Sequence, residues 1–151
     1  MNICPCQKQQ DNPVEYQHCC KPFHDGLAGS TQKAISPKQL MRSRYSAYVL
    51  GLDNYLRRTW HSSTCPHSLS AQPDDQWLKL EVLADSASQV RFKAFFKDQD
   101  GFHCLEETSD FVIENNHLVY LSGVTQMHTI TLNRNDVCLC GSGKKFKKCC
   151  Q

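Results

Sequence analysis

Several familiar signatures are missing from this chain of 151 residues. No stretch approaches the roughly 20 apolar residues that a membrane-spanning helix needs, and the first residues show no basic stretch followed by an apolar run, as a secretion signal would. A phosphate-binding loop, a dinucleotide fingerprint and an H-E-x-x-H motif are also absent. The formal net charge is +2, which does not argue for nucleic acid or an acidic membrane as a partner. We therefore expect a cytoplasmic binding protein rather than an enzyme.

Cysteine, in contrast, is abundant and unevenly placed. Of the ten cysteines, only Cys65 and Cys104 lie in the middle of the chain. Thiols stay reduced in the cytoplasm, where clustered cysteines more often bind metals or take part in catalysis than form disulfides. The eight terminal cysteines are therefore predicted metal ligands: Cys4, Cys6, Cys19, Cys20, Cys138, Cys140, Cys149 and Cys150.

The C-terminal cysteines have a spacing that favours a structural zinc site. A C-x-C pair at 138–140 precedes Gly141-Ser142-Gly143, where the backbone can reverse. We expect a short helix over 144–148, capped by Ser142, to carry the pair at 149–150 back to the first. Four thiolates would close a tetrahedral shell around Zn²⁺, as structural sites do. A disulfide between the pairs is the alternative in an oxidising compartment, but adjacent cysteines bridge only with strain.

The N-terminal cysteines repeat these pairs with a longer interval. Twelve residues, rather than eight, separate the C-x-C pair at 4–6 from the adjacent pair at 19–20, and the Gly-Ser-Gly turn is missing. His18 and His24 lie near enough in sequence to replace a cysteine as ligand. We predict a second Zn²⁺ here, with this ligand set left open.

Four lysines accompany the C-terminal cysteines: Lys144, Lys145, Lys147 and Lys148. They can simply offset the charge of −2 that a zinc ion with four thiolates carries. They can also form a basic surface for a protein or ribosome partner, or for nucleic acid, which the near-neutral chain supports less well.

The central part predicts helices followed by strands. Ser36 is a suitable N-cap for a helix that begins at Pro37, and Gly51 should end it, with Asp53 capping a second helix. Apolar residues recur at helical spacing: Leu40 or Met41, Tyr45, Tyr48, Leu52, Leu56 and Trp60. An irregular connection is expected over 61–76, and linkers over 25–35 and 124–137.

Alternating patterns after residue 76 predict strands at Trp77–Leu83, Val90–Lys97, Phe102–Ile113 and Leu118–Leu121. The short links between them imply antiparallel neighbours. Helices first and a meander after indicate an α+β fold, with the helices packed on one face of a curved antiparallel sheet.

These residues resemble a known family. The segment Cys138–Cys150 is similar to the SEC-C motif, the zinc-binding tail also found in the SecA translocation ATPase, although Leu139 replaces the usual proline and Gln151 the terminal glycine. The whole chain resembles the YchJ family, which carries SEC-C motifs around a nuclear-transport-factor-two-like (SnoaL-like, cystatin-like) domain. The central matches are Leu40–Tyr48, Tyr55-Leu56, Thr59-Trp60-His61, Trp77-Leu78, Glu107, Ser109 and Phe111.

The resemblance implies a cone-shaped central domain at 30–127 between zinc modules at 1–24 and 134–151. By analogy with SecA, it implies contact with a chaperone or ribosome. Such cones often contain a pocket, and seven residues could line it: Arg42, Arg44, Tyr45, Tyr48, Trp60, His61 and Glu107. They can instead be core residues, with an arginine paired to Glu107. A His61–Glu107 acid/base pair is a further hypothesis.

Three functions follow from these patterns. The first is an interaction module whose zinc sites present a fixed surface to a partner. The second is a small-molecule binder or enzyme that uses the central pocket. The third is a redox sensor in which oxidation of the cysteines expels zinc.

Overall fold

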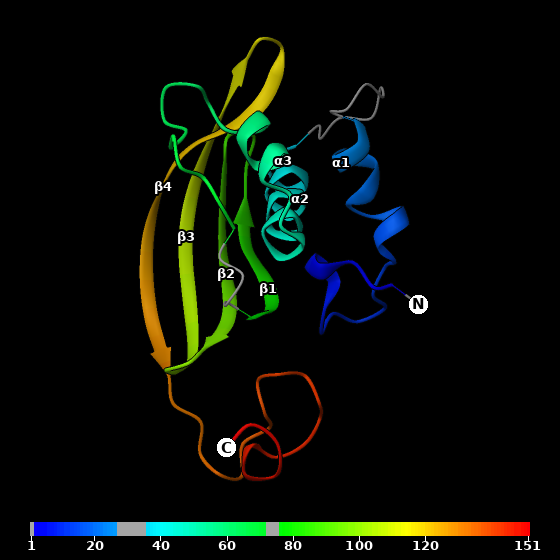
Figure 1. The fold of residues 1–151 in the computed structure, drawn as a ribbon, viewed down its shortest axis with the longest axis vertical. Coiled ribbons are helices and arrows are strands. Elements are labelled where there is room, and N and C mark those ends of the chain that lie inside the picture. Colours follow the sequence, from blue (N-terminus) through cyan, green and yellow to red (C-terminus); the bar gives the residue numbers. More distant parts are fainter. Residues whose placement is uncertain (1, 27–35, 72–75) are drawn as a thin grey trace.

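The computed structural model describes residues 2–26, 36–71 and 76–151. It confirms the predicted α+β fold, in which helices cover one face of a curved antiparallel sheet (Figure 1). The helical elements are η1 (Pro5–Gln7), η2 (Tyr16–His18), α1 (Lys21–Gly26), α2 (Pro37–Leu50), α3 (Asp53–Arg58) and η3 (Phe146–Lys148). The strands are β1 (Gln76–Asp85), β2 (Gln89–Asp98), β3 (Gly101–Glu114) and β4 (His117–Ile130).

The sheet is a simple meander in the order β1-β2-β3-β4, with every neighbouring pair antiparallel. Asn115 and Asn116 have φ of 52° and 65°, the left-handed conformations that a two-residue hairpin turn requires. The prediction that 124–137 is a linker is wrong for its first half, because β4 pairs with β3 as far as Ile130 opposite Phe102. Most β4 side chains after Val124 are exposed, so the sequence shows no apolar alternation that would predict a strand here. Backbone hydrogen bonds to β3 form this part of β4 instead.

The helix boundaries follow the predicted caps in two of three cases. The Ser36 hydroxyl accepts a hydrogen bond from the Gln39 amide at 3.2 Å, and Gly51 ends α2 with φ of 72°. Asp53 does not cap α3, because it is already the first residue of that helix. Its carboxylate instead accepts a hydrogen bond from the backbone of Ala71 at 3.0 Å, which ties the following connection to the helix.

The connecting segments partly match their predictions. The segment 61–71 is irregular, as expected, and 72–75 lies outside the described residues. Of the predicted linker 25–35, the first two residues belong to α1, while 27–35 also lies outside the described part of the chain.

One hydrophobic core joins the N-terminal module to the central domain. Leu40, Met41 and Tyr45 of α2 pack against the inner face of the sheet, in the same cluster as Cys4, Cys6 and Cys20. Figure 1 shows α2 between the sheet and α1. The first cysteine group is therefore part of the folded domain and not an appendage.

The C-terminal module lies beyond one end of the sheet (Figure 1). The Gln9 side chain donates hydrogen bonds to the carbonyls of Leu139 at 3.1 Å and Leu78 at 3.4 Å. The rings of Phe102 and Phe146 meet edge to face at 5.9 Å.

None of the helices in the described segments is long and apolar enough to cross a bilayer.

Candidate metal centres and a central cavity

Cys4, Cys6, Cys19 and Cys20 bring their four sulfur atoms within 4.8 Å of one another. Cys6 Sγ lies 3.7 Å from Cys4, 3.5 Å from Cys19 and 3.6 Å from Cys20. Sulfur atoms at 2.3 Å from a central zinc ion would be about 3.8 Å apart at the corners of a tetrahedron. The group therefore fits one tetrahedral metal ion without rearrangement.

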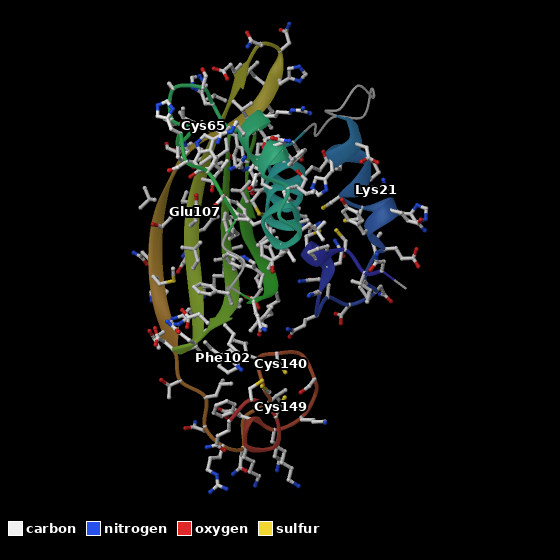
Figure 2. The ribbon with its side chains drawn as sticks, viewed as in Figure 1. Lys21, Cys65, Phe102, Glu107, Cys140 and Cys149 are labelled. Carbon is white, nitrogen blue, oxygen red and sulfur yellow. The ribbon has the colours of Figure 1, made fainter. Side chains whose placement is uncertain are left out.

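The C-terminal sulfur atoms form a second group of the same kind, again within 4.8 Å of one another. Cys149 Sγ lies 3.3 Å from Cys140 and 3.8 Å from Cys150, while Cys138 is almost fully buried at 2% exposure. Figure 2 shows Cys140 and Cys149 in the terminal loop, with Phe102 above them at the end of the sheet.

Both modules use the same backbone design. A single 3₁₀ turn, η2 or η3, ends at the first cysteine of the adjacent pair, with φ,ψ of −120°, −91° at Cys19 and −135°, −93° at Cys149. The amide of Cys4 bonds to Val14 at 2.9 Å, and that of Cys138 to Lys144 at 2.8 Å. The two cysteine modules are therefore structural repeats.

The repeats differ in how the chain reverses between their cysteine pairs. Gly141 and Gly143 have φ of 87° and 81°, whereas Gln9 and Asn12 have φ of 61° and 53° in the N-terminal module. Positive φ is accessible to asparagine and less so to glutamine. The longer N-terminal loop thus replaces the missing glycine turn with two non-glycine residues in the same region of backbone space.

The predicted short helix over 144–148 is smaller than expected. Only Phe146–Lys148 is helical, as one 3₁₀ turn whose N-cap is Lys145. Ser142 does not cap it, because its hydroxyl accepts from the Lys144 amide at 3.2 Å and lies 3.2 Å from Cys149 Sγ. The five residues between the turn and the cysteine pair are too few for a stable α-helix.

Disulfides do not account for the eight terminal cysteines. All ten cysteines are free, and the sulfur contacts of 3.3–4.0 Å greatly exceed the 2.05 Å of a disulfide.

The crowded thiols differ in their proton affinity. Hydrogen bonds from Cys19 and then Cys20 hold the pKa of Cys4 well below its usual range, while the hydrogen bond with Cys19 raises the pKa of Cys20. The Ser142 hydrogen bond lowers the pKa of Cys140 to about 6, and burial raises that of Cys150 to about 12. Each group therefore contains one sulfur whose pKa is lowered and one whose pKa is raised. A divalent ion would allow all four sulfurs to ionise.

Neither candidate histidine belongs to the first sulfur group. Both ring nitrogens of His24 already have partners, since Nδ1 accepts from the Tyr16 hydroxyl at 2.7 Å and Nε2 donates to the Ser43 carbonyl at 2.8 Å. Burial lowers the pKa of His24, which keeps the ring neutral in these two bonds. Four cysteines without histidine thus form the group.

A cavity of about 270 Å³ lies between α2 and the inner face of the sheet. Its lining residues are Met41, Arg44, Tyr45, Tyr48, Trp60, Trp77, Phe92, Ala94, Leu105, Glu107, Ser109, Phe111 and Tyr120. Five of the seven predicted pocket residues are among them, whereas Arg42 and His61 are not. Sequence reasoning missed Trp77 and Tyr120 as lining residues. Both are aromatic residues on strands, and Trp77 is also one of the matches to the family.

Among the described residues, Arg44 is the only cation that lines this cavity. It is 6% exposed, and its Nη1 donates to the Leu56 carbonyl at 2.9 Å and to the Thr59 hydroxyl at 2.7 Å. Its guanidinium lies 4.9 Å from the ring centre of Trp60 and 4.8 Å from that of Tyr120. Burial lowers the pKa of Arg44, and the two rings stabilise the cation only in part.

Glu107 occupies the opposite wall, in the middle of β3 (Figure 2). Its Oε1 accepts hydrogen bonds from the Ser109 and Tyr120 hydroxyls, both at 2.9 Å. A Cβ at Gly123 would lie 2.1 Å from that same oxygen, so glycine there leaves room for the carboxylate. The predicted arginine–Glu107 pair does not form, since none of the recorded ion pairs of the described residues includes Glu107 or Arg44.

His61 lies outside the cavity and does not meet Glu107. Its Nε2 lies 3.2 Å from the carboxylate of Glu114, and its Nδ1 accepts from the Ser63 hydroxyl at 2.7 Å. The turn after α3 directs the ring towards the hairpin end of the sheet. The His61–Glu107 acid/base hypothesis therefore fails on geometry.

Residues 36–123 match the family described as YchJ, middle NTF2-like domain, and residues 134–151 match the SEC-C motif. A UPF0225 protein from Shewanella sp. (strain MR-4) is 40% identical, covering 97% of this chain and 94% of its own length. One from Vibrio parahaemolyticus is 37% identical, with 97% of each chain covered.

The fold is also that of a crystallised protein. A SEC-C motif containing protein from Psychrobacter arcticus is 34% identical with a TM-score of 0.70, and 99% of this chain and 96% of that one are covered. The extent and identity of these matches show that the chain belongs to the YchJ (UPF0225) family.

Proposed function

We propose that this protein binds two Zn²⁺ ions, each in a closed shell of four thiolates, and that both ions are structural. The observation that carries the proposal is the near-tetrahedral spacing of the sulfur atoms in both groups. An all-sulfur set favours zinc over the hard cations magnesium and calcium. A shell with no open position leaves no place for a catalytic water.

Metal analysis of each site tests this proposal. Protein purified under reducing conditions should contain about two zinc ions per chain, one for each sulfur group. Cys6→Ser and Cys140→Ser should each remove about one ion, while Cys65→Ser, outside both groups, should remove none. Metal-free protein with intact, reduced thiols would refute the proposal.

We further propose that the C-terminal module is an interaction module for an acidic protein surface in the cytoplasm, such as one on the ribosome. Lys144, Lys145, Lys147 and Lys148 are all exposed, and the described ion pairs include none of them. The segment 134–151 adds Arg134 and only one carboxylate, so it stays cationic even around a zinc tetrathiolate.

Charge removal on the intact chain tests the interaction. Replacing the four lysines with glutamine should abolish capture of the partner, whereas Lys8→Gln, an exposed lysine elsewhere, should not. The capture should weaken as salt rises and should survive nuclease treatment. Loss of capture after nuclease would identify RNA instead, and equal capture by the four-lysine variant would reject the proposal.

A second candidate function is the binding of a small molecule in the central cavity. Three buried side-chain atoms of the described residues have no hydrogen-bond partner, and two of them favour this function, the hydroxyl of Tyr45 and Nε1 of Trp60. Both residues line the cavity, and buried polar groups in folded proteins are rarely left without hydrogen bonds.

A further inference from the structure

The two edge strands of the sheet, β1 and β4, are protected unequally. An edge strand carries unpaired backbone groups, and proteins commonly protect them with bulges, lysines or a covering segment. β1 has two irregularities in its register with β2, the first of them next to Lys79. The Gln10 side chain also donates a hydrogen bond to the Leu80 carbonyl of β1 at 2.9 Å. The β1 edge is therefore protected.

The first part of the β4 edge is covered as well. The Tyr120 amide donates to the Thr59 carbonyl at 2.8 Å, and the Tyr120 carbonyl accepts from the His61 amide at 2.7 Å. The Leu121 carbonyl accepts from the Thr64 hydroxyl at 2.6 Å. This cover ends there, and the remaining part of β4, residues 122–130, forms the outer margin of the sheet in Figure 1.

Residues 122–130 have none of the protective features of β1. The segment contains no proline, lysine, arginine or acidic residue, and its register with β3 is regular from Ser122 to Ile130. Residues 124–129 are all exposed, with Val124 at 75% and Met127 at 58% exposure. A regular, uncharged and exposed edge of this kind is a template for another strand.

The register identifies the backbone groups that are available for pairing. The Phe111 amide of β3 donates to the Ser88 carbonyl at 2.8 Å, so Phe111 points away from β4, and so does every second residue before it in β3. The β4 residues opposite these residues point away from β3 in turn. The recorded hydrogen bonds of the described residues use no outward amide or carbonyl of Gly123, Thr125, Met127 and Thr129.

We infer that residues 122–130 of β4 pair antiparallel with the same residues of a second copy of this chain, so that two four-stranded sheets become one. Gln126 lies on the twofold axis and faces Gln126 of the second copy. Thr125 then lies opposite Met127 of the second copy, and Gly123 opposite Thr129. These pairs and their symmetry mates would form about eight backbone hydrogen bonds, two for each pair.

The covered part of β4 selects this register. Pairing about Gln126 matches the whole open segment with itself and leaves Tyr120 and Leu121 with their present partners. A shift towards the start of β4 would need the backbone groups of Tyr120 that Thr59 and His61 already occupy.

The composition of the segment selects the second copy as its occupant. Like charges directly opposite each other destabilise a strand pair, and this segment has neither acidic residues nor lysine and arginine. Every outward-pointing residue finds an outward-pointing counterpart in the second copy. Strand pairing alone buries less surface than a standard interface, so we expect a dimer that dissociates on dilution.

Sedimentation equilibrium of the full-length protein under reducing conditions tests the inference. Between about 10 μM and about 1 mM, the mass should rise from 17.3 kDa towards twice that value. Thr125→Pro should weaken the dimer at least tenfold, because proline removes one outward amide and obstructs the incoming strand. Its unfolding midpoint should stay near that of the original chain, since the Thr125 amide does not pair with β3.

Charge exchange at Gln126 tests the twofold register itself. Gln126→Lys and Gln126→Glu should each weaken the dimer at least tenfold, because each new charge would meet its own copy. An equal mixture of the two variants should form a mixed dimer. A lysine at this position would lie opposite Glu106 of β3, which is compatible with the fold. Gln99→Lys and Gln99→Glu, at an exposed position in the β2–β3 turn, are the controls and should leave the dimer unchanged.

Three results would overturn the inference. A monomer at every concentration would show that the open edge stays unpaired. A dimer that persists equally in Thr125→Pro and Gln126→Lys would place the interface elsewhere on the molecule. Loss of the dimer in Thr125→Pro, but not in either charge variant, would show that β4 pairs in a register that is not centred on Gln126.

Discussion

The hydroxyl of Ser46 donates a hydrogen bond to the sulfur of Cys20 at 3.3 Å and lies 3.5 Å from that of Cys4. Ser46 is fully buried on α2, the helix that also carries Arg44 and Tyr45 on the cavity side. One helix therefore contacts the first sulfur group with one face and lines the cavity with the other. This shared helix joins the N-terminal cysteines to the central domain.

Ser46→Ala should weaken zinc binding at the N-terminal site. The hydroxyl stabilises a thiolate, and partners of metal ligands contribute about 10–100-fold in affinity. Competition with a chelator measures the loss. The exposed Ser63→Ala, outside both sulfur groups, is the control, and equal affinity of the two variants would show that Ser46 has no such role.

Loss of the two metal sites should affect stability unequally. Cys4, Cys6 and Cys20 belong to the main hydrophobic core, so Cys6→Ser should leave buried thiolates without a counter-charge and lower the free energy of unfolding by roughly 3 kcal/mol or more. Cys149 is exposed, and Cys149→Ser should lower the stability of the central domain by less than about 1 kcal/mol. Denaturant unfolding compares them, and equal losses would contradict this account.

Peroxide should release zinc from the C-terminal site before the N-terminal one. Cys149 is exposed, whereas Cys4 is 0% and Cys6 is 2% exposed, and oxidation follows thiolate access. A zinc-sensitive dye records two phases, and Cys140→Ser should remove the fast one. Simultaneous release would refute the difference between sites. The absence of any zinc release would reject the redox-sensor hypothesis.

Gly123→Ala should destabilise the sheet. The added methyl would lie 2.1 Å from Glu107 Oε1, and overpacking of this kind costs about 1–3 kcal/mol. Adding Glu107→Ala should recover part of that loss, because the clashing carboxylate is gone. A double-mutant cycle measures the coupling, and purely additive effects would mean that the two residues do not compete for space.

Gln9→Ala should loosen the C-terminal module without unfolding the domain. Gln9 is the side chain that hydrogen-bonds both β1, at Leu78, and the C-terminal loop, at Leu139. Faster amide exchange confined to residues around Leu139 is the expected result. Gln17→Ala, which removes an exposed side chain bonded to Glu15, should leave exchange there unchanged. Identical exchange in both variants would assign the anchoring to Phe102 and Phe146.

Cap and turn residues in the sequence predicted those helix ends that depend on a single side chain or on the φ of one residue. Ser36 and Gly51 mark the ends of α2 because a hydroxyl cap and a positive φ are properties of single residues. The same signals failed at Asp53, whose carboxylate is used by the distant backbone of Ala71. They failed again at 124–130, where pairing with β3 determines the strand although its side chains stay exposed.

The sequence by itself determined which sulfur atoms can gather, because each cysteine pair and its turn lie within a few residues of one another. It also determined the order of α2, α3 and the four strands, through caps and alternation. Only the tertiary structure decided that both ring nitrogens of His24 form hydrogen bonds, with Tyr16 and Ser43. It also placed His61 beside Glu114, and it placed Arg44 and Glu107 in one cavity without an ion pair between them. These outcomes depend on how α2 and the curved sheet pack, and no local spacing encodes the distance between elements so far apart in the chain.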